Sequence, residues 1–139
     1  MQAQKLDMSP RILIWGYTGE EQEAFCAFLG EIGAPPAVSI PGNRGCLFVH
    51  EILFSDKESE KAFICDEKVV LFFNMEAQVV HKVMNEGKKR DLPRPIYAMV
   101  TRQNIEWTFD DLVEHLVKER NFITEKKRQR DKERVGGHS

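Results

Sequence analysis

The sequence of 139 residues lacks any long hydrophobic run. A helix that spans a membrane needs about 20 consecutive, mainly apolar residues, and no stretch here approaches that length. The opening residues, MQAQKLDMSPRILIWGY, also contain no small-residue cleavage site of the kind that ends a secretory leader. We therefore expect a cytoplasmic protein with no membrane association.

Cysteine is scarce as well. Cys26, Cys46 and Cys65 are odd in number and show no CxxC spacing, so they predict neither a disulfide framework nor a zinc-finger site. Cys46 and His50 are four residues apart and share a face, yet no further ligands complete a metal set. We expect free thiols, no bound metal and no cofactor.

Motifs for phosphate binding or catalysis are missing too. The turn Gly42-Asn43-Arg44-Gly45 has two glycines, but it has neither the GxGxxG spacing nor a following Lys-Ser/Thr pair. The acidic residues that follow Gly19 and Phe109 stand at expected helix starts, where the helix dipole explains them. No carboxylate pair or Cys–His arrangement is left for acid–base or nucleophilic chemistry, so we assign no catalytic residues and leave open whether the protein is an enzyme.

Charge is present in quantity but is unevenly spread. The whole chain carries a net charge of −2, whereas residues 118–134 hold eight Lys/Arg and four Asp/Glu, a local +4. The remaining residues therefore carry −6. Such a basic tail either attracts an acidic partner or is a solvated helix end, and the sequence does not decide its role.

Four apolar runs predict β-strands, at residues 11–15, 37–40, 68–73 and 95–100. In the last run, every residue from Ile96 to Val100 is apolar or aromatic, which is typical of a strand buried on both faces. The segment from residue 46 to 54 alternates poorly, so strand and helix both remain open there.

Helical patterns follow three of these runs. Thr18 and Glu21 have capping-box spacing ahead of an apolar stripe that ends before Gly33. Asn74 is expected to cap a second helix. Thr108 is expected to cap a third, with apolar residues at 109, 112, 113, 116 and 117 and none past 123 until 135.

The order of these elements predicts one domain. Residues 1–9 form a flexible N-terminus, residues 10–124 a single α/β domain, and residues 125–139 a charged C-terminal extension. Residues 11–40 and 68–101 both run strand, helix, glycine, prolines, strand. We predict an α+β fold, a ferredoxin-like duplicated βαβ sandwich with an added C-terminal helix. The alternative is a small Rossmann-like α/β open sheet with helices on both faces.

One segment resembles a known family. Ala98, Thr101, Asn104 and the pair Trp107-Thr108 match the Ala-x-x-Thr, Asn and Trp-Thr pattern of a short, uncharacterised bacterial family described only as a domain of unknown function. The resemblance extends from Val69 to Arg120 and implies no known activity.

The loop between the last strand and the last helix is the candidate site. Thr101, Arg102, Asn104 and Trp107 stand where the end of a strand meets a helix N-terminus, a place where α/β sheets bind anions. In the alternative, structural interpretation, Thr101 and Asn104 bond the backbone of their own turn. Trp107 then packs as a staple beside the helix start.

Three functional hypotheses follow. The first is a non-enzymatic interaction or regulatory module that self-associates or binds a protein partner, since capping and packing account for most of the polar landmarks. The second is a small-ligand or anion-binding domain, or an enzyme, that uses the loop from Thr101 to Trp107. The third is RNA binding, which we rank last because the tail mixes both signs of charge and the sequence has no RNP pattern.

Overall fold

The computed structural model describes residues 7–90 and 92–136, with side chains up to residue 130. Most of the expected N-terminal segment 1–9, and residues 137–139 of the expected extension, lie outside the described residues. The elements are β1 (Arg11–Trp15), α1 (Gly19–Glu31), β2 (Ala37–Ser39), η1 (Gly42–Arg44), α2 (Val49–Phe54), β3 (Val69–Phe73), α3 (Ala77–Lys88), β4 (Ile96–Met99), η2 (Asn104–Glu106) and α4 (Phe109–Gly136). No helix within these ranges is both long enough and apolar enough to cross a membrane.

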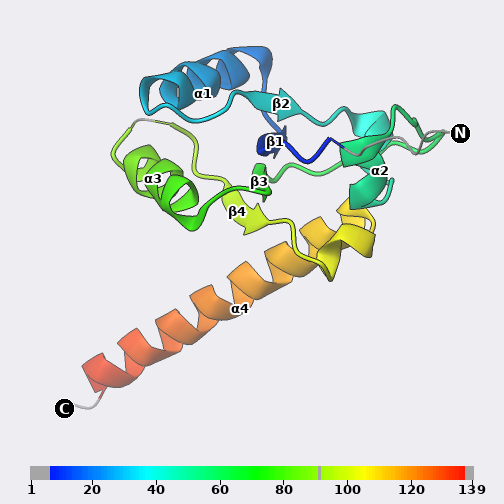
Figure 1. The fold of residues 1–139 in the computed structure, drawn as a ribbon. Coiled ribbons are helices and arrows are strands. Elements are labelled where there is room, and N and C mark those ends of the chain that lie inside the picture. The colour runs from blue at the N-terminus through cyan, green and yellow to red at the C-terminus, as the bar shows by residue number, and fades with distance from the viewer. Residues whose placement is uncertain (1–6, 91, 137–139) are drawn as a thin grey trace, which may run out of the picture.

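The four strands form one mixed sheet in the order β2-β1-β3-β4 (Figure 1). β1 pairs with β2 in parallel and β3 pairs with β4 in parallel, whereas the two central strands, β1 and β3, run antiparallel. The central register places Leu13 opposite Leu71. Each half of the sheet is therefore one βαβ unit, joined to the other half through its first strand.

The α+β fold with a duplicated βαβ unit and an added C-terminal helix is confirmed. The ferredoxin-like arrangement is not. In that fold each βαβ unit is split, with a strand of the other unit between its own two strands. Here the two strands of each unit are direct neighbours. Helices on both faces, which the Rossmann-like alternative predicted, are present, but that alternative did not include an antiparallel centre.

Two apolar clusters lie on opposite faces of the sheet, because successive side chains of a strand point to opposite sides. Ile12 and Ile14 of β1 face α1 and α3, with Phe25, Phe28, Leu29, Val70, Phe72, Val80 and Val83 in the same cluster. Leu13 and Trp15 face α2 and the first half of α4, with Val49, Leu53, Leu71, Phe73, Phe109 and Leu112. In Figure 1, α1 and α3 lie to the left of the sheet, and α2 and the start of α4 lie to the right.

The start and end of α1 follow the sequence signals. The Thr18 hydroxyl accepts from the Glu21 amide at 3.2 Å, and the Glu21 carboxylate accepts from the Thr18 amide at 2.9 Å. This reciprocal pair is the predicted capping box. Gly33 follows the helix with φ +76°, a conformation that glycine adopts without strain.

Three other expectations need correction or completion. Asn74 does not cap α3: it has φ 51° and its side-chain amide donates to the Met8 carbonyl, while α3 begins at Ala77 after Glu76. The undecided segment 46–54 contains the helix α2. The strand from Ile96 is not buried on both faces, because β4 is an edge strand and Met99 is 43% exposed.

Candidate functional site

The loop from Thr101 to Trp107 is a closed turn held by its own side chains. The Thr101 amide donates to the Asn104 side-chain oxygen at 2.7 Å, and the Asn104 amide donates to the Thr101 hydroxyl at 3.0 Å. The Asn104 side-chain amide donates to the Met99 carbonyl at 2.9 Å. Two of the four predicted site residues are thus brought together, and their polar groups are used to bond the loop itself.

The other two predicted site residues have different surroundings. Arg102 is exposed. Trp107 is half-buried, packs against the cluster under α2 and α4, and meets His115 edge-on at a ring-centroid distance of 5.3 Å. Backbone bonds beside it, from the Val49 amide to the Trp107 carbonyl and from the Phe109 amide to the Leu47 carbonyl, join the starts of α2 and α4. Trp107 therefore lies where a helix-anchoring residue should lie.

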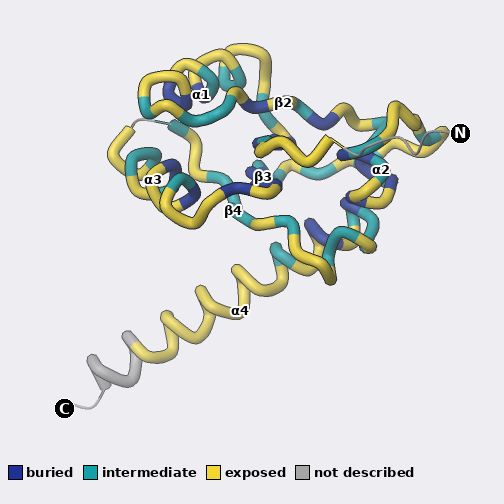
Figure 2. Tube along the Cα trace, viewed as in Figure 1, coloured by how far each residue is buried: buried dark blue, intermediate teal, exposed yellow. Residues whose placement is uncertain are grey.

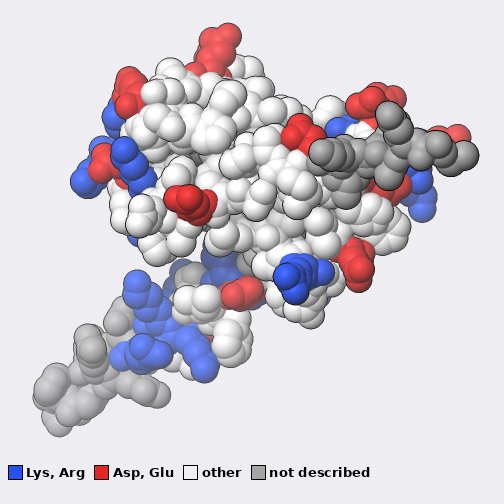
Figure 3. All heavy atoms as spheres, viewed as in Figure 1, with Lys and Arg blue, Asp and Glu red and all other residues white. Residues whose placement is uncertain are grey.

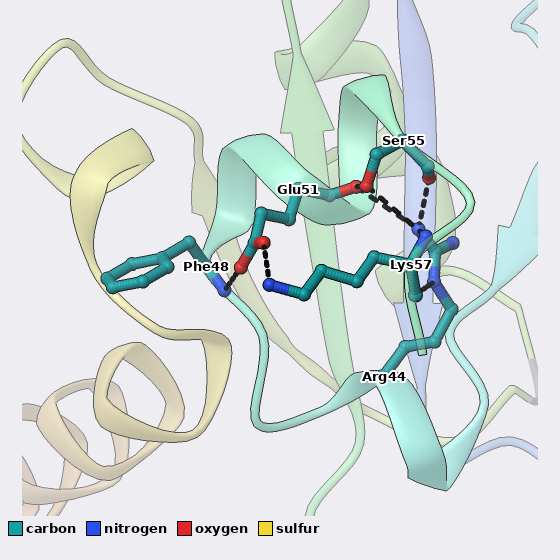
Figure 4. Close-up of polar contacts among 5 residues, drawn as sticks. All are labelled: Arg44, Phe48, Glu51, Ser55 and Lys57. Carbon is teal, nitrogen blue, oxygen red and sulfur yellow. Dashed lines mark hydrogen bonds and ion pairs between the residues drawn. The ribbon is translucent and has the colours of Figure 1, made fainter. Parts of the chain in front are cut away.

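A polar network around Arg44 surrounds α2 (Figure 4). Its guanidinium donates to the carbonyls of Glu51, Ile52 and Ser55, at 3.2, 3.3 and 2.5 Å. The Glu51 carboxylate accepts from the Phe48 amide and pairs with Lys57, and the Lys57 hydrogen bond holds the pKa of Glu51 below its usual value. These contacts satisfy both ends of α2, so the network is structural.

The described side chains in the far half of α4 form no such structural network and are exposed to solvent. Beyond Val117 every described side chain, from residue 118 to 130, is exposed, and the helix extends away from the body (Figure 2). We call residues 118–130 the arm. Phe122 and Ile123 on the arm are 61% and 57% exposed, and the Lys126 ammonium lies 5.0 Å from the Phe122 ring centroid. Figure 3 shows basic side chains gathered on the arm, whose basic residues in the sequence are Lys118, Arg120, Lys126, Lys127, Arg128 and Arg130.

One ion pair anchors the base of the arm. The Arg120 guanidinium donates to both Glu67 carboxylate oxygens, at 2.7 and 2.8 Å. This paired hydrogen bond holds the pKa of Glu67 below its usual value. The pair joins α4 to the irregular segment that precedes β3, so the direction of the arm is set relative to the sheet.

A groove of about 380 Å³ lies beside this ion pair. On one side it has Phe63, Ile64 and Cys65, and on the other it has Val113 and Val117 of α4. Ile64 is 89% exposed. Three acidic residues, Glu67, Asp110 and Glu114, and one basic residue, Lys118, line the same groove. It is an apolar surface with a mainly acidic rim.

Among the residues that the structure describes, no group of three or more His, Cys, Asp or Glu is placed to hold a metal ion. The three cysteines are separate, partly buried thiols.

Sequence reasoning missed the groove and both ends of the ion pair. The short apolar run Ala62-Phe63-Ile64-Cys65 within a strongly charged segment was the available signal. Phe122 and Ile123 follow directly on the apolar stripe of α4, but the sequence does not show where the body stops covering it.

The fold and this surface define a small mixed α/β domain with a projecting, basic C-terminal helix. Residues 68–123 match the model of a family described as a domain of unknown function (DUF3783). The matched segment runs from β3 to Ile123, which confirms the resemblance to an uncharacterised family. No curated protein and no solved structure matches the chain.

Proposed function

We propose that this protein is a non-enzymatic interaction module and that the arm is its binding element. The observation that carries the proposal is the exposure of Phe122 and Ile123 on a helix that leaves the body. A solvated helix end has no need of two neighbouring large apolar side chains, whereas helix-mediated recognition uses them as anchors.

The surroundings of these two side chains favour a protein surface as the occupant. Basic residues follow them along the helix, and an aromatic or aliphatic anchor beside basic groups suits a surface that is apolar and acidic. The Thr101–Trp107 loop is a weaker candidate for a binding site, because the polar groups of Thr101 and Asn104 already form hydrogen bonds within the loop itself.

Site-specific photo-crosslinking tests the proposal. A photoreactive side chain replaces Phe122 in one chain and Val38 in a control chain. Val38 is 54% exposed on β2, away from the arm. In extracts of the cells that make the protein, we expect discrete protein adducts from position 122, displaced by an excess of the unmodified purified chain.

Equal adducts from positions 122 and 38, or no adduct that the purified chain displaces, would contradict the proposal. A chain that carries the photoreactive group at 122 together with Ile123→Asp should lose the adducts, because a buried carboxylate weakens an apolar contact.

A further inference from the structure

We infer that the binding partner of the arm is a second copy of this chain. The two α4 helices run antiparallel, and each arm lies in the groove between Phe63–Glu67 and α4 of the other copy. The inference rests on the proposed function, because it requires the arm to be a binding element.

The arm presents the same helix face that α4 buries against its own body. Phe109, Leu116, Ile123 and Arg130 recur every seven residues, so they lie along nearly one line of the helix. Phe109 is fully buried, Leu116 is half-buried and Ile123 is 57% exposed. The core-facing stripe therefore continues past the edge of the body without a cover.

The groove of a second copy offers a matching apolar surface. Ile64, at 89%, is the most exposed of the large apolar side chains among the described residues, and half-buried Val117 lies across the groove from it. Seating Ile123 of one copy against Ile64 of the other removes two exposed apolar surfaces from water at once.

Charge complementarity determines the relative direction of the two α4 helices. Asp110 and Glu114 line the groove near the start of α4, whereas Lys127, Arg128 and Arg130 lie near its far end. An antiparallel pair places basic ends beside acidic starts and opposes the two helix dipoles. A parallel pair would instead place basic groups beside basic groups.

The spacing along the helix agrees with this direction. Asp110 and Arg128 are 18 residues apart, which is five whole turns of an α-helix, so their side chains lie on the same face of α4. Arg128 of one copy can therefore meet Asp110 of the other when the two helices run antiparallel. Two-fold symmetry then repeats every contact.

The groove acids are available for such contacts. Glu67 is held by Arg120, whereas the one ion pair of Glu114 among the described residues is with Lys118, one turn away on the surface, at 3.1 Å. Exposed pairs of this kind contribute little and exchange readily.

Charge reversal tested by sedimentation velocity decides the inference. An arm variant carries Lys127→Glu, Arg128→Glu and Arg130→Glu, and a groove variant carries Asp110→Lys and Glu114→Lys. We expect the parent chain to dimerise with rising concentration, and each variant alone to dimerise at least about tenfold more weakly.

Mixing the two variants should restore a dimer, because both of its contacts then join opposite charges. A control with Lys82→Glu, Lys88→Glu and Arg94→Glu has the same net charge as the arm variant but is changed at exposed positions on and after α3. It should dimerise like the parent and should not form a new complex with the groove variant. That result would exclude net charge alone as the cause of the weaker dimerisation of the arm variant.

Several results would overturn the inference. The inference fails if the parent chain stays monomeric, or if both variants dimerise as well as the parent. If the arm variant paired with the parent more tightly than the parent pairs with itself, the helices would be parallel, and this would also overturn the inference. If position 122 then crosslinks to a different protein, the proposed function stands and only self-pairing fails. Crosslinks to RNA would contradict both the proposed function and self-pairing.

A second measurement covers the case in which the groove variant does not fold. Ile123→Cys should form an intermolecular disulfide with Cys65, which lines the groove, under mild oxidation. Adding Cys65→Ser should abolish that bond. Persistence of the same crosslinked dimer without Cys65 would contradict the seating of the arm in the groove.

Discussion

The two halves of α4 belong to one helix, yet they differ in what covers them. Phe109, Leu112 and Val113 are buried against the sheet, while residues 118–130 are exposed throughout. The second half makes surface ion pairs instead of core contacts, such as Arg120 with Glu67 at 2.7 Å. The comparison teaches that a helix and its apolar stripe can continue beyond the part of the protein that buries the side chains of that stripe.

The largest effect should come from the buried half. Phe109 is fully buried, and its ring centroid lies 5.4 Å from that of Trp15. Phe109→Ala should lower the free energy of unfolding by about 3–5 kcal/mol, because it removes a large side chain and leaves a cavity. The urea midpoint measures this loss.

The matched control for Phe109→Ala is in the same helix. Phe122→Ala should change the free energy of unfolding by less than about 0.5 kcal/mol in dilute protein, because Phe122 is 61% exposed. Equal losses at positions 109 and 122 would show that the two halves do not differ as described.

The start of α4 should give the next largest effect. Trp107→Ala should cost about 2–3 kcal/mol, below the range for a fully buried tryptophan, because the indole is half-buried. Trp107→Phe should retain most of the stability, since it keeps an aromatic ring beside His115. If Trp107→Ala leaves the urea midpoint unchanged, the loop regains its place as a candidate ligand site.

Local patterns predicted the elements well where one physical effect dominates. The continuous apolar runs of β1 and β3 arise because both faces of these central strands are buried. The Thr18–Glu21 capping box forms because its bonds join residues three apart. The self-bonded turn of Thr101 and Asn104 was likewise readable as the structural alternative for the candidate site.

Features set by tertiary placement could not be predicted in this way. The residues of β4 look like those of a central strand, but its place at the sheet edge depends on which strands pair, and no local pattern encodes that order. Asn74 suits a helix cap by type, yet its side-chain amide donates to the carbonyl of Met8, which is distant in sequence. The Glu67–Arg120 pair and the groove beside it join distant segments in the same way.

The boundary between the two halves should give a smaller effect, visible as pH dependence. The pKa of Glu67 is lower in the folded state, because Arg120 donates to its carboxylate. The stability from this pair is therefore present above the ordinary Glu pKa of about 4.3 and is lost as the pH falls through the lower, folded-state value. At neutral pH we expect at most about 1 kcal/mol, because the pair is partly exposed.

Glu67→Gln measures this contribution as the difference in urea midpoint from the parent at each pH. The difference should shrink as the solution is acidified. Glu60→Gln, at an exposed glutamate in the same segment, should show no such trend. A difference that stays constant down to acidic pH would mean that the ion pair does not stabilise the base of the arm.

The smallest effect should follow removal of the exposed half itself. Truncation after Thr124 removes four basic residues of the arm, Lys126, Lys127, Arg128 and Arg130, and none of the residues whose side chains the structure describes in contact with either core cluster. In dilute protein the free energy of unfolding should change by less than about 0.5 kcal/mol, because no buried apolar surface is lost. At high protein concentration the parent should gain stability from association, and the truncated chain should not. A truncation that lowers the urea midpoint equally at both concentrations would place the second half of α4 among the elements that hold the monomer together, and the contrast between the two halves would fail.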